Sequence, residues 1–322
     1  MSTPAWLDII LDSPSPTAAW SGVFARLEEL AVTCGSPVDL HNQTVAPDRL
    51  LAETAWELWG SYPEAAPRTA TQLKEWCAAP SSIGRAVLVL DALSLREMPW
   101  ILGGAQARHI QPTDVRVTGA ESPSDTDQFA HALGVPSRSH LAGNGAPGSF
   151  NLFPSKAYTD VISVPFEDAV GGIPHESNVF VWHSWLDDLI HVHKKLPDQI
   201  YKTAAATLQD DGFWKFANRL RQGRKLIITS DHGYAVSKLF SSEEIDPDVI
   251  EKLRETFGAA RYKKVNGPWQ ERFMPPIVVS HNEHHIVMGQ RKWKVQGGFP
   301  HVCHGGLSLL EVAVPFIELP PL

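Results

Sequence analysis

Two short apolar runs, each followed closely by an aspartate, constrain the fold of this chain more than any other feature. Val87-Leu-Val-Leu precedes Asp91, and Leu226-Ile-Ile precedes Thr-Ser-Asp231. An unbroken apolar run with polar residues at both ends is typical of a strand buried on both faces of a parallel sheet. Such a sheet needs helices on both of its faces, so the two runs predict an α/β protein.

Strand-like and helix-like segments alternate from Ser81 onward, which supports this prediction. Residues 1–80 instead have apolar positions at helical spacing, for example in a helix predicted to begin at Pro47. We therefore expect a helical N-terminal region, residues 1–80, followed by an α/β domain, residues 81–322. The predicted strands are Ala86–Leu90, Asp114–Val117, Asp160–Pro165, Asn178–Trp182, Lys225–Thr229, Pro276–Val279, His285–Met288 and Val312–Ile317.

The composition narrows the class of protein. Of the 322 residues, 43% are hydrophobic and 20% charged, as in ordinary globular proteins. The net charge of −8 argues against a large surface for duplex nucleic acid, although bound divalent cations would reverse the local sign of an acidic pocket. Cys34, Cys77 and Cys303 form no disulfide pattern. With no signal peptide and no apolar run of membrane-spanning length, we expect a cytoplasmic protein without membrane contact.

Polar residues at the predicted strand ends are candidate metal ligands, because ligands of open α/β sheets bind at the carboxyl ends of the strands. Asp91 follows the first buried strand, and Asp231, His232 and Gly233 follow the second. Gly233 permits the turn that would let Asp231 and His232 face one ion. Alone, Asp91 is equally well explained as a capping aspartate.

Two further segments carry ligand-type residues. Asp187 and His191 are four residues apart in a predicted helix, so they share one face and could bind one ion or form a surface pair. His304 precedes two glycines, and Ser308 and Glu311 have the spacing of a capping box at the start of the next apolar run. His304 alone could equally be a structural turn residue.

Together these residues supply enough oxygen and nitrogen donors for two metal sites of about three ligands each. Mixed carboxylate and imidazole ligands suit zinc, with manganese as the alternative. The six candidate ligands are Asp91, Asp187, His191, Asp231, His232 and His304.

The same motifs, in this order, resemble those of PglZ domains of the alkaline phosphatase superfamily. The resemblance covers residues 83–322, and its most specific parts are Ser230-Asp-His-Gly233 and His304-Gly-Gly-Leu-Ser. It implies an alkaline-phosphatase-like sheet sandwiched by helices. It also implies a metal-dependent phosphoryl-ester hydrolase with two divalent ions, one held by Asp91, Asp231 and His232 and the other by Asp187, His191 and His304.

The superfamily places a Ser or Thr nucleophile between the first aspartate and the Asp-xxx-His helix. Pro123-Ser-Asp-Thr126, followed by Gly134, Pro136 and His140, resembles the pattern of the superfamily's diesterases. On that match Thr126 is the nucleophile and also a metal ligand, with Ser124 as the alternative. The aromatic-proline continuation that usually follows is absent here. Without the family, both residues would be ordinary helix caps.

The resemblance implies in-line attack by Thr126, a phosphothreonine intermediate and hydrolysis of that intermediate by water. We favour a phosphodiester substrate, such as a nucleotide or short oligonucleotide, because PglZ proteins commonly occur in phage-defence systems such as BREX. A monoesterase would need additional cations for the third phosphate oxygen, for which Arg96, Arg138 and Lys156 are candidates. The competing class is a metal-stabilised scaffold that binds protein partners in a defence complex.

Overall fold

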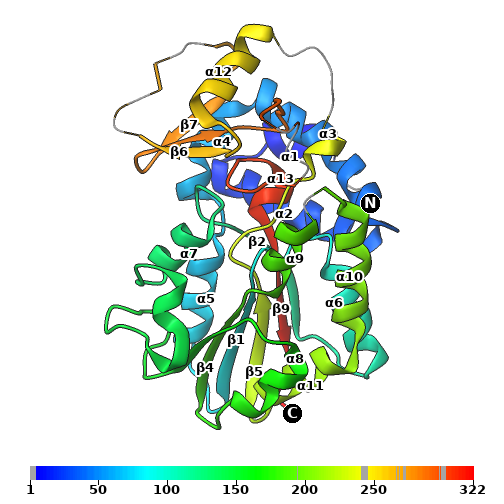
Figure 1. Ribbon diagram of the computed structural model, residues 1–322, viewed down its shortest axis with the longest axis vertical. Helices are drawn as coiled ribbons and strands as arrows, with labels where there is room; N and C mark the ends of the chain where they lie inside the picture. The colour runs from blue at the N-terminus through cyan, green and yellow to red at the C-terminus, as the bar shows by residue number, and fades with distance from the viewer. Residues whose placement is uncertain are drawn as a thin grey trace.

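The computed structural model describes residues 5–193, 195–240, 246–265, 267, 269–270, 273–296, 298 and 302–322. No helix among these residues is both long and apolar enough to cross a membrane. Figure 1 shows a sheet flanked by helices, with the N-terminal helices and a small second sheet gathered beyond the end of the larger sheet.

The main sheet has six strands in the order β2-β9-β5-β1-β4-β3. The central strand β1 is parallel to β4 and β5, and β3 is parallel to β4, whereas β9 is antiparallel to β5 and β2. The predicted parallel α/β core is therefore confirmed, with two further strands that make the sheet mixed. The strands are β1 Gly84–Leu90, β2 Asp114–Gly119, β3 Tyr158–Ile162, β4 Asn178–His183, β5 Arg224–Thr229 and β9 Ala313–Leu319.

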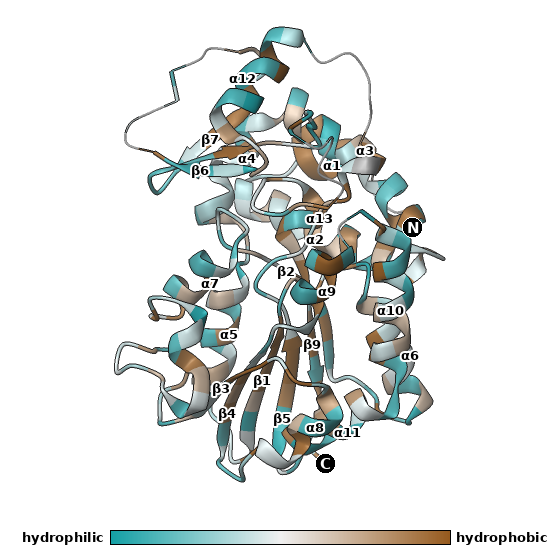
Figure 2. Ribbon diagram, in the orientation of Figure 1, coloured by the Kyte–Doolittle hydropathy of each residue, from teal (hydrophilic) through white to brown (hydrophobic). Residues whose placement is uncertain are grey.

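Alternation along β1 explains why helices cover both faces of the sheet. Val87 and Val89 join the apolar cluster that includes α5 (Thr69–Ala78) and α7 (Thr126–Ala132). Ala86, Leu88 and Leu90 join the cluster that includes α6 (Met98–Ala107), α10 (Pro197–Gln209) and α11 (Asp211–Arg221). The brown stretches of the central strands in Figure 2 mark apolar residues, and those of β1 from Ala86 to Leu90 are fully buried.

The N-terminal helices are α1 (Trp6–Leu11), α2 (Pro16–Thr33), α3 (Pro37–Glu53) and α4 (Trp56–Ala65). The predicted helix start at Pro47 is wrong, because Pro47 lies inside α3 and the helix begins ten residues earlier, where Ser36 Oγ accepts a hydrogen bond from Asp39 N at 3.1 Å. Residues of these helices belong to the same apolar cluster as Leu88 of β1. The helical region therefore packs directly on the sheet-bearing part of the chain.

The remaining elements complete the structure. A second, antiparallel sheet has the order β6-β8-β7, and β6 was not predicted because it is a three-residue strand of partly exposed Tyr and Lys. Each of the eight predicted strands overlaps an observed strand. These elements are β6 Tyr262–Lys264, β7 Val278–His281, β8 His284–Val287, α8 Phe166–Ala169, α9 Trp185–His193, α12 Pro247–Phe257, α13 Leu309–Val312, and the 3-10 helices η1 Arg138–Asn144, η2 Val170–Gly172 and η3 Ser237–Leu239.

Candidate metal centre

Three of the predicted ligands meet at the carboxyl edge of the sheet. Asp91 directly follows β1, and Asp231 and His232 follow β5, which is its parallel neighbour. Their ligand atoms lie within 4.8 Å of one another, and all three side chains are fully buried. We call Asp91, Asp231 and His232 the strand-end cluster.

Hydrogen bonds and close packing of the segment Ser230–Gly233 hold this cluster in place. Ser230 Oγ lies 2.8 Å from Leu90 O and 2.7 Å from His232 O, both within hydrogen-bonding distance. Ala92 N donates to Asp231 Oδ1 at 3.1 Å, which leaves Asp231 Oδ2 facing the site. Gly233 is required because a Cβ there would lie 2.4 Å from the Leu310 carbonyl oxygen.

A hydrogen bond fixes the ring of His232. Its Nδ1 donates to Gly233 O at 2.9 Å, so Nε2 faces Asp231 and Asp91 at 3.5 and 3.8 Å. Burial lowers the pKa of His232, but the charge of Asp231 and the Gly233 carbonyl outweigh burial and raise it. An environment that favours a positive charge at Nε2 also favours a metal cation there.

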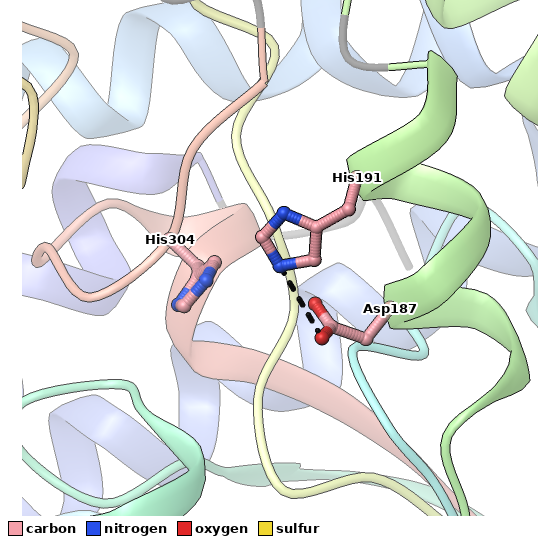
Figure 3. Close-up of side chains that lie close together, drawn as sticks. All are labelled: Asp187, His191 and His304. Carbon is pink, nitrogen blue, oxygen red and sulfur yellow. Dashed lines mark ion pairs between the residues drawn. The ribbon is translucent and has the colours of Figure 1, made fainter. Parts of the chain in front are cut away.

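The other three predicted ligands form a second group, which we call the helix-turn cluster. Asp187 and His191 come from α9 and His304 from the turn before α13, with ligand atoms within 4.8 Å of one another. Figure 3 shows the three side chains converging from these two segments, with Asp187 Oδ2 and His191 Nε2 3.4 Å apart. This cluster is more open, since 64% of the His191 side chain is exposed.

Two atoms of the helix-turn cluster, Asp187 Oδ1 and His304 Nδ1, are buried without a hydrogen-bond partner. Burial raises the pKa of Asp187, and burial together with His232 lowers the pKa of His304 to about 4. A neutral imidazole and an unpaired carboxylate oxygen are competent metal donors.

The turn that carries His304 is built by close packing. Gly305 has a φ of 92°, and a Cβ there would lie 2.4 Å from the Tyr262 ring. Glu311 Oε1 accepts hydrogen bonds from Gly306 N at 3.0 Å and from Arg261 Nε at 2.8 Å. The expected capping box is not formed in the usual way, because Ser308 Oγ donates to Glu311 Oε2 and caps no backbone amide.

The two clusters lie side by side. The rings of His232 and His304 are stacked, with centroids 4.4 Å apart and an angle of 14° between their planes. Each cluster offers oxygen and nitrogen donors of the kinds that zinc and manganese bind. The residues therefore fit a pair of divalent cations.

Thr126 lies against the strand-end cluster. Its Oγ1 is 2.7 Å from Asp231 Oδ2, 3.4 Å from Asp91 Oδ1 and 3.4 Å from His232 Nε2. Thr126 begins α7, whose cap Asp125 accepts a hydrogen bond from Asp127 N at 3.0 Å.

Ser124, the alternative nucleophile, has a different environment. It is fully buried, and its Oγ donates to Gly306 O at 2.9 Å and accepts from Gly305 N at 3.1 Å. Its hydroxyl is therefore engaged in holding the glycine turn beside His304.

Of the three candidate cations, the structure brings Arg138 to the site. Arg138 Nη1 contacts Asp91 Oδ2, and Trp182 Nε1 donates to the same oxygen at 3.1 Å. Arg96 is buried and bonds Ser94 and Tyr234 rather than any candidate ligand, and Lys156 is exposed. Sequence reasoning missed Trp182, because an indole within an apolar strand gives no polar signal.

Among the comparisons with known proteins, a family model matches about half of the chain. This model, described as the BREX system PglZ alkaline phosphatase-like domain, matches residues 154–319, a segment that includes five of the six candidate ligands but neither Asp91 nor Thr126. A search of curated protein sequences finds no match.

Several solved structures are similar at low identity. A mouse ectonucleotide pyrophosphatase/phosphodiesterase 5 is 15% identical, with 74% of this chain and 88% of that chain covered and a TM-score of 0.44. An inactive form of it in complex with AMP is 14% identical, with the same coverage and TM-score. Phosphonoacetate hydrolase from Sinorhizobium meliloti, in complex with phosphonoformate, is 13% identical, with 74% and 90% covered and a TM-score of 0.40.

Proposed function

This chain belongs to the PglZ alkaline-phosphatase-like family, as its motifs predicted, and from that premise we propose that it is a metal-dependent phosphodiesterase with Thr126 as its nucleophile. The observation that carries the proposal is the position of Thr126 Oγ1, which lies within 3.4 Å of an atom of each strand-end ligand. The proposed catalytic domain is residues 81–322, with the helices of residues 1–80 packed on it.

We propose that the strand-end cluster, with Thr126, holds one divalent ion and the helix-turn cluster holds a second. The ions are zinc, or manganese as the alternative, in keeping with the mixed donors. When bound, they would supply Lewis acidity that lowers the pKa of the attacking hydroxyl and offsets the charge of the phosphoryl group.

The residues of the chain then account for the reaction as follows. Thr126 Oγ1 gives up its proton, for which Asp231 Oδ2 at 2.7 Å is the nearest acceptor, and attacks phosphorus. The bond from phosphorus to the leaving oxygen breaks, and that oxygen receives the proton that Asp231 took from Thr126. Water then attacks phosphorus, the bond from phosphorus to Thr126 Oγ1 breaks, and one proton of the water restores the Thr126 hydroxyl as the product leaves. The Arg138 guanidinium is a donor for a non-bridging phosphate oxygen.

The proposed substrate is a nucleotide or a short oligonucleotide. Its support is the family's description as part of the BREX system. The proposed setting is phage defence, with other proteins of the system as partners. Because the net charge is −8, we expect binding of an anionic substrate to depend on the metal ions and Arg138.

One observation favours a second candidate, a phosphomonoesterase. Arg138 contacts Asp91, which is itself 3.4 Å from the Thr126 hydroxyl, so a guanidinium is available beside the reacting group. A monoester carries one more charged oxygen than a diester, and such an oxygen is a good partner for arginine.

The test compares hydrolysis of bis-p-nitrophenyl phosphate and p-nitrophenyl phosphate by protein loaded with zinc or manganese. We expect faster turnover of the diester, loss in Thr126→Ala, and recovery in Thr126→Ser. Ser124→Ala tests the alternative nucleophile, because it keeps the Thr126 hydroxyl but loses the hydrogen bonds to Gly305 and Gly306. Preference for the monoester would favour the second candidate, whereas bound metal without turnover of either ester would point to a scaffold.

A further inference from the structure

Two of the buried polar residues of helix α3, His41 and Asp48, bond to other parts of the chain. His41 and Asp48 are seven residues, or two helical turns, apart, so they lie on the same face of α3. Each is 1% exposed. A buried polar side chain costs stability unless it is hydrogen-bonded. The hydrogen-bond partners of these two residues therefore show which segments this face of α3 contacts.

Asp48 caps the short helix that follows the His304 turn. Its Oδ1 accepts a hydrogen bond at 2.8 Å from the backbone amide of Leu309, the first residue of α13. Its Oδ2 accepts one from Gln290 Nε2 at 2.6 Å. Ser308, the residue at the cap position, makes no such bond, so the cap comes from a helix 261 positions away in the sequence.

His41 contacts the loop that follows the other ligand segment. His41 Nε2 donates to the carbonyl of Leu239 at 3.1 Å, and its ring stacks on Phe240 at 6.3 Å between centroids. Leu239 lies in η3, a few residues beyond Asp231 and His232. The segment that follows His232 and the segment that follows His304 are therefore both hydrogen-bonded to α3.

The two loops are also joined to each other. Ala235 N donates to Cys303 O at 2.7 Å, and Cys303 N donates to Ala235 O at 3.0 Å. These bonds lie next to His304 on one loop and close to His232 on the other. A shift of either loop at α3 is thus transmitted to the stacked pair of rings.

We propose that α3 positions the two imidazole-bearing loops of the metal centre, with Asp48 as the positioning residue for the His304 turn. This inference rests on the proposed metal-dependent function. Removal of the Asp48 carboxyl would leave the Leu309 amide buried and unpaired, and the turn would have to move to find another acceptor. His304 would then be displaced from Asp187 and His191.

The test measures metal binding and catalysis separately in the full chain. Mn²⁺ affinity and stoichiometry are measured by competition with a chromophoric chelator, and kcat and KM with the better nitrophenyl ester. The variants are Asp48→Ala, which removes the cap, and Asp48→Asn, whose amide oxygen can still accept from Leu309. Gln43→Ala, at an exposed position of the same helix, is the control.

We expect Asp48→Ala to bind one of the two ions about tenfold more weakly, as is typical when a group that supports a metal ligand is lost. We also expect a lower kcat at an unchanged KM, and recovery of both properties in Asp48→Asn. A folded Asp48→Ala protein with normal Mn²⁺ affinity and kcat would overturn the proposal.

A second variant covers the case in which Asp48→Ala does not fold. His41→Ala acts on the other loop, so it should weaken Mn²⁺ binding without removing the α13 cap. Normal Mn²⁺ binding in folded His41→Ala would then refute the role of α3. If wild type binds Mn²⁺ but hydrolyses neither ester, the proposed function fails while the affinity measurements still decide the role of Asp48.

Discussion

The strand-end cluster and the helix-turn cluster contain similar candidate ligands in different structural settings. Asp91, Asp231 and His232 follow neighbouring parallel strands and are fully buried. Asp187 and His191 lie on a nine-residue helix, and His304 lies in a turn supported from α3. The first cluster is thus placed by the sheet itself, whereas the second depends on the docking of separate segments.

The difference indicates that the two clusters should respond differently to mutation and to metal supply. A ligand at a buried strand end has neighbours that fix it, such as Ala92 N and Trp182 Nε1. A ligand on an exposed helix face, such as His191, has fewer neighbours that fix its position. We therefore expect tight binding at the strand-end cluster and weaker, exchangeable binding at the helix-turn cluster.

The largest expected effect follows from Asp231→Asn. The change removes a charge that is 2.7 Å from Thr126 Oγ1 and keeps the shape of the side chain. We expect one metal ion fewer per chain and a loss of kcat/KM greater than about 100-fold, because a direct ligand matters more than a supporting group. Elemental analysis and ester hydrolysis check this. Full metal content with normal activity would remove Asp231 from the site.

A smaller effect, a weakening of metal binding that added metal can reverse, is expected from His191→Ala. The side chain is 64% exposed, so the free energy of unfolding should change by less than about 0.5 kcal/mol. Metal binding at the helix-turn cluster should weaken, and added Mn²⁺ should restore activity. Thermal unfolding and a Mn²⁺ titration of the hydrolysis rate provide the measurement. A variant that added metal does not rescue would contradict the contrast between the clusters.

The supporting indole of Trp182 should contribute less than a direct ligand. Trp182→Phe keeps an aromatic ring in β4 but loses the donor to Asp91 Oδ2. We expect about tenfold weaker binding of one metal ion. Chelator competition measures this, with Trp185→Phe as a control on the neighbouring helix. Equal affinity in both variants would show that Asp91 needs no help from Trp182.

A further prediction concerns how the stability of the protein depends on pH. Burial raises the pKa of Asp48 from 3.8 to about 7, so the folded protein keeps a proton that the unfolded chain has lost between these values. Wild type therefore loses stability as the pH rises through this window, by up to about 1.4 kcal/mol per pH unit from this group. Asp48→Asn has no carboxyl at this position, so it should not lose stability in this way.

Denaturant unfolding of wild type and Asp48→Asn from pH 4 to pH 7 checks the prediction. The stability of the variant relative to wild type should increase with pH and become constant above pH 7. A difference independent of pH would mean that the folded-state pKa of Asp48 is not raised.

The sequence predicted the sheet and the grouping of ligand-type residues because both leave local signals. Apolar runs mark β1 and β5, and each candidate ligand occupies a recognisable motif at a strand end, on a helix face or beside paired glycines. The strand-end ligands could be expected to meet because parallel neighbouring strands end at the same edge.

The residues that hold the candidate ligands in place could not be predicted in the same way. Asp48 acts across a long sequence separation, and the predicted helix start at Pro47 put the residue at a helix terminus rather than on a buried face. In the sequence, Trp182 is one of several apolar residues of a predicted strand. Only the family resemblance favoured Thr126 over Ser124 in the sequence, whereas in the structure the two hydroxyls have different hydrogen-bond partners.

The most direct test is to locate the covalent intermediate. Wild type loaded with metal is mixed with bis-p-nitrophenyl phosphate, quenched in acid and digested, and the phosphorylated peptide is sequenced by mass spectrometry. We expect the nitrophenyl phosphoryl group on Thr126 and its absence in Thr126→Ala. A modified Ser124, or turnover without any modified residue, would contradict nucleophilic attack by Thr126.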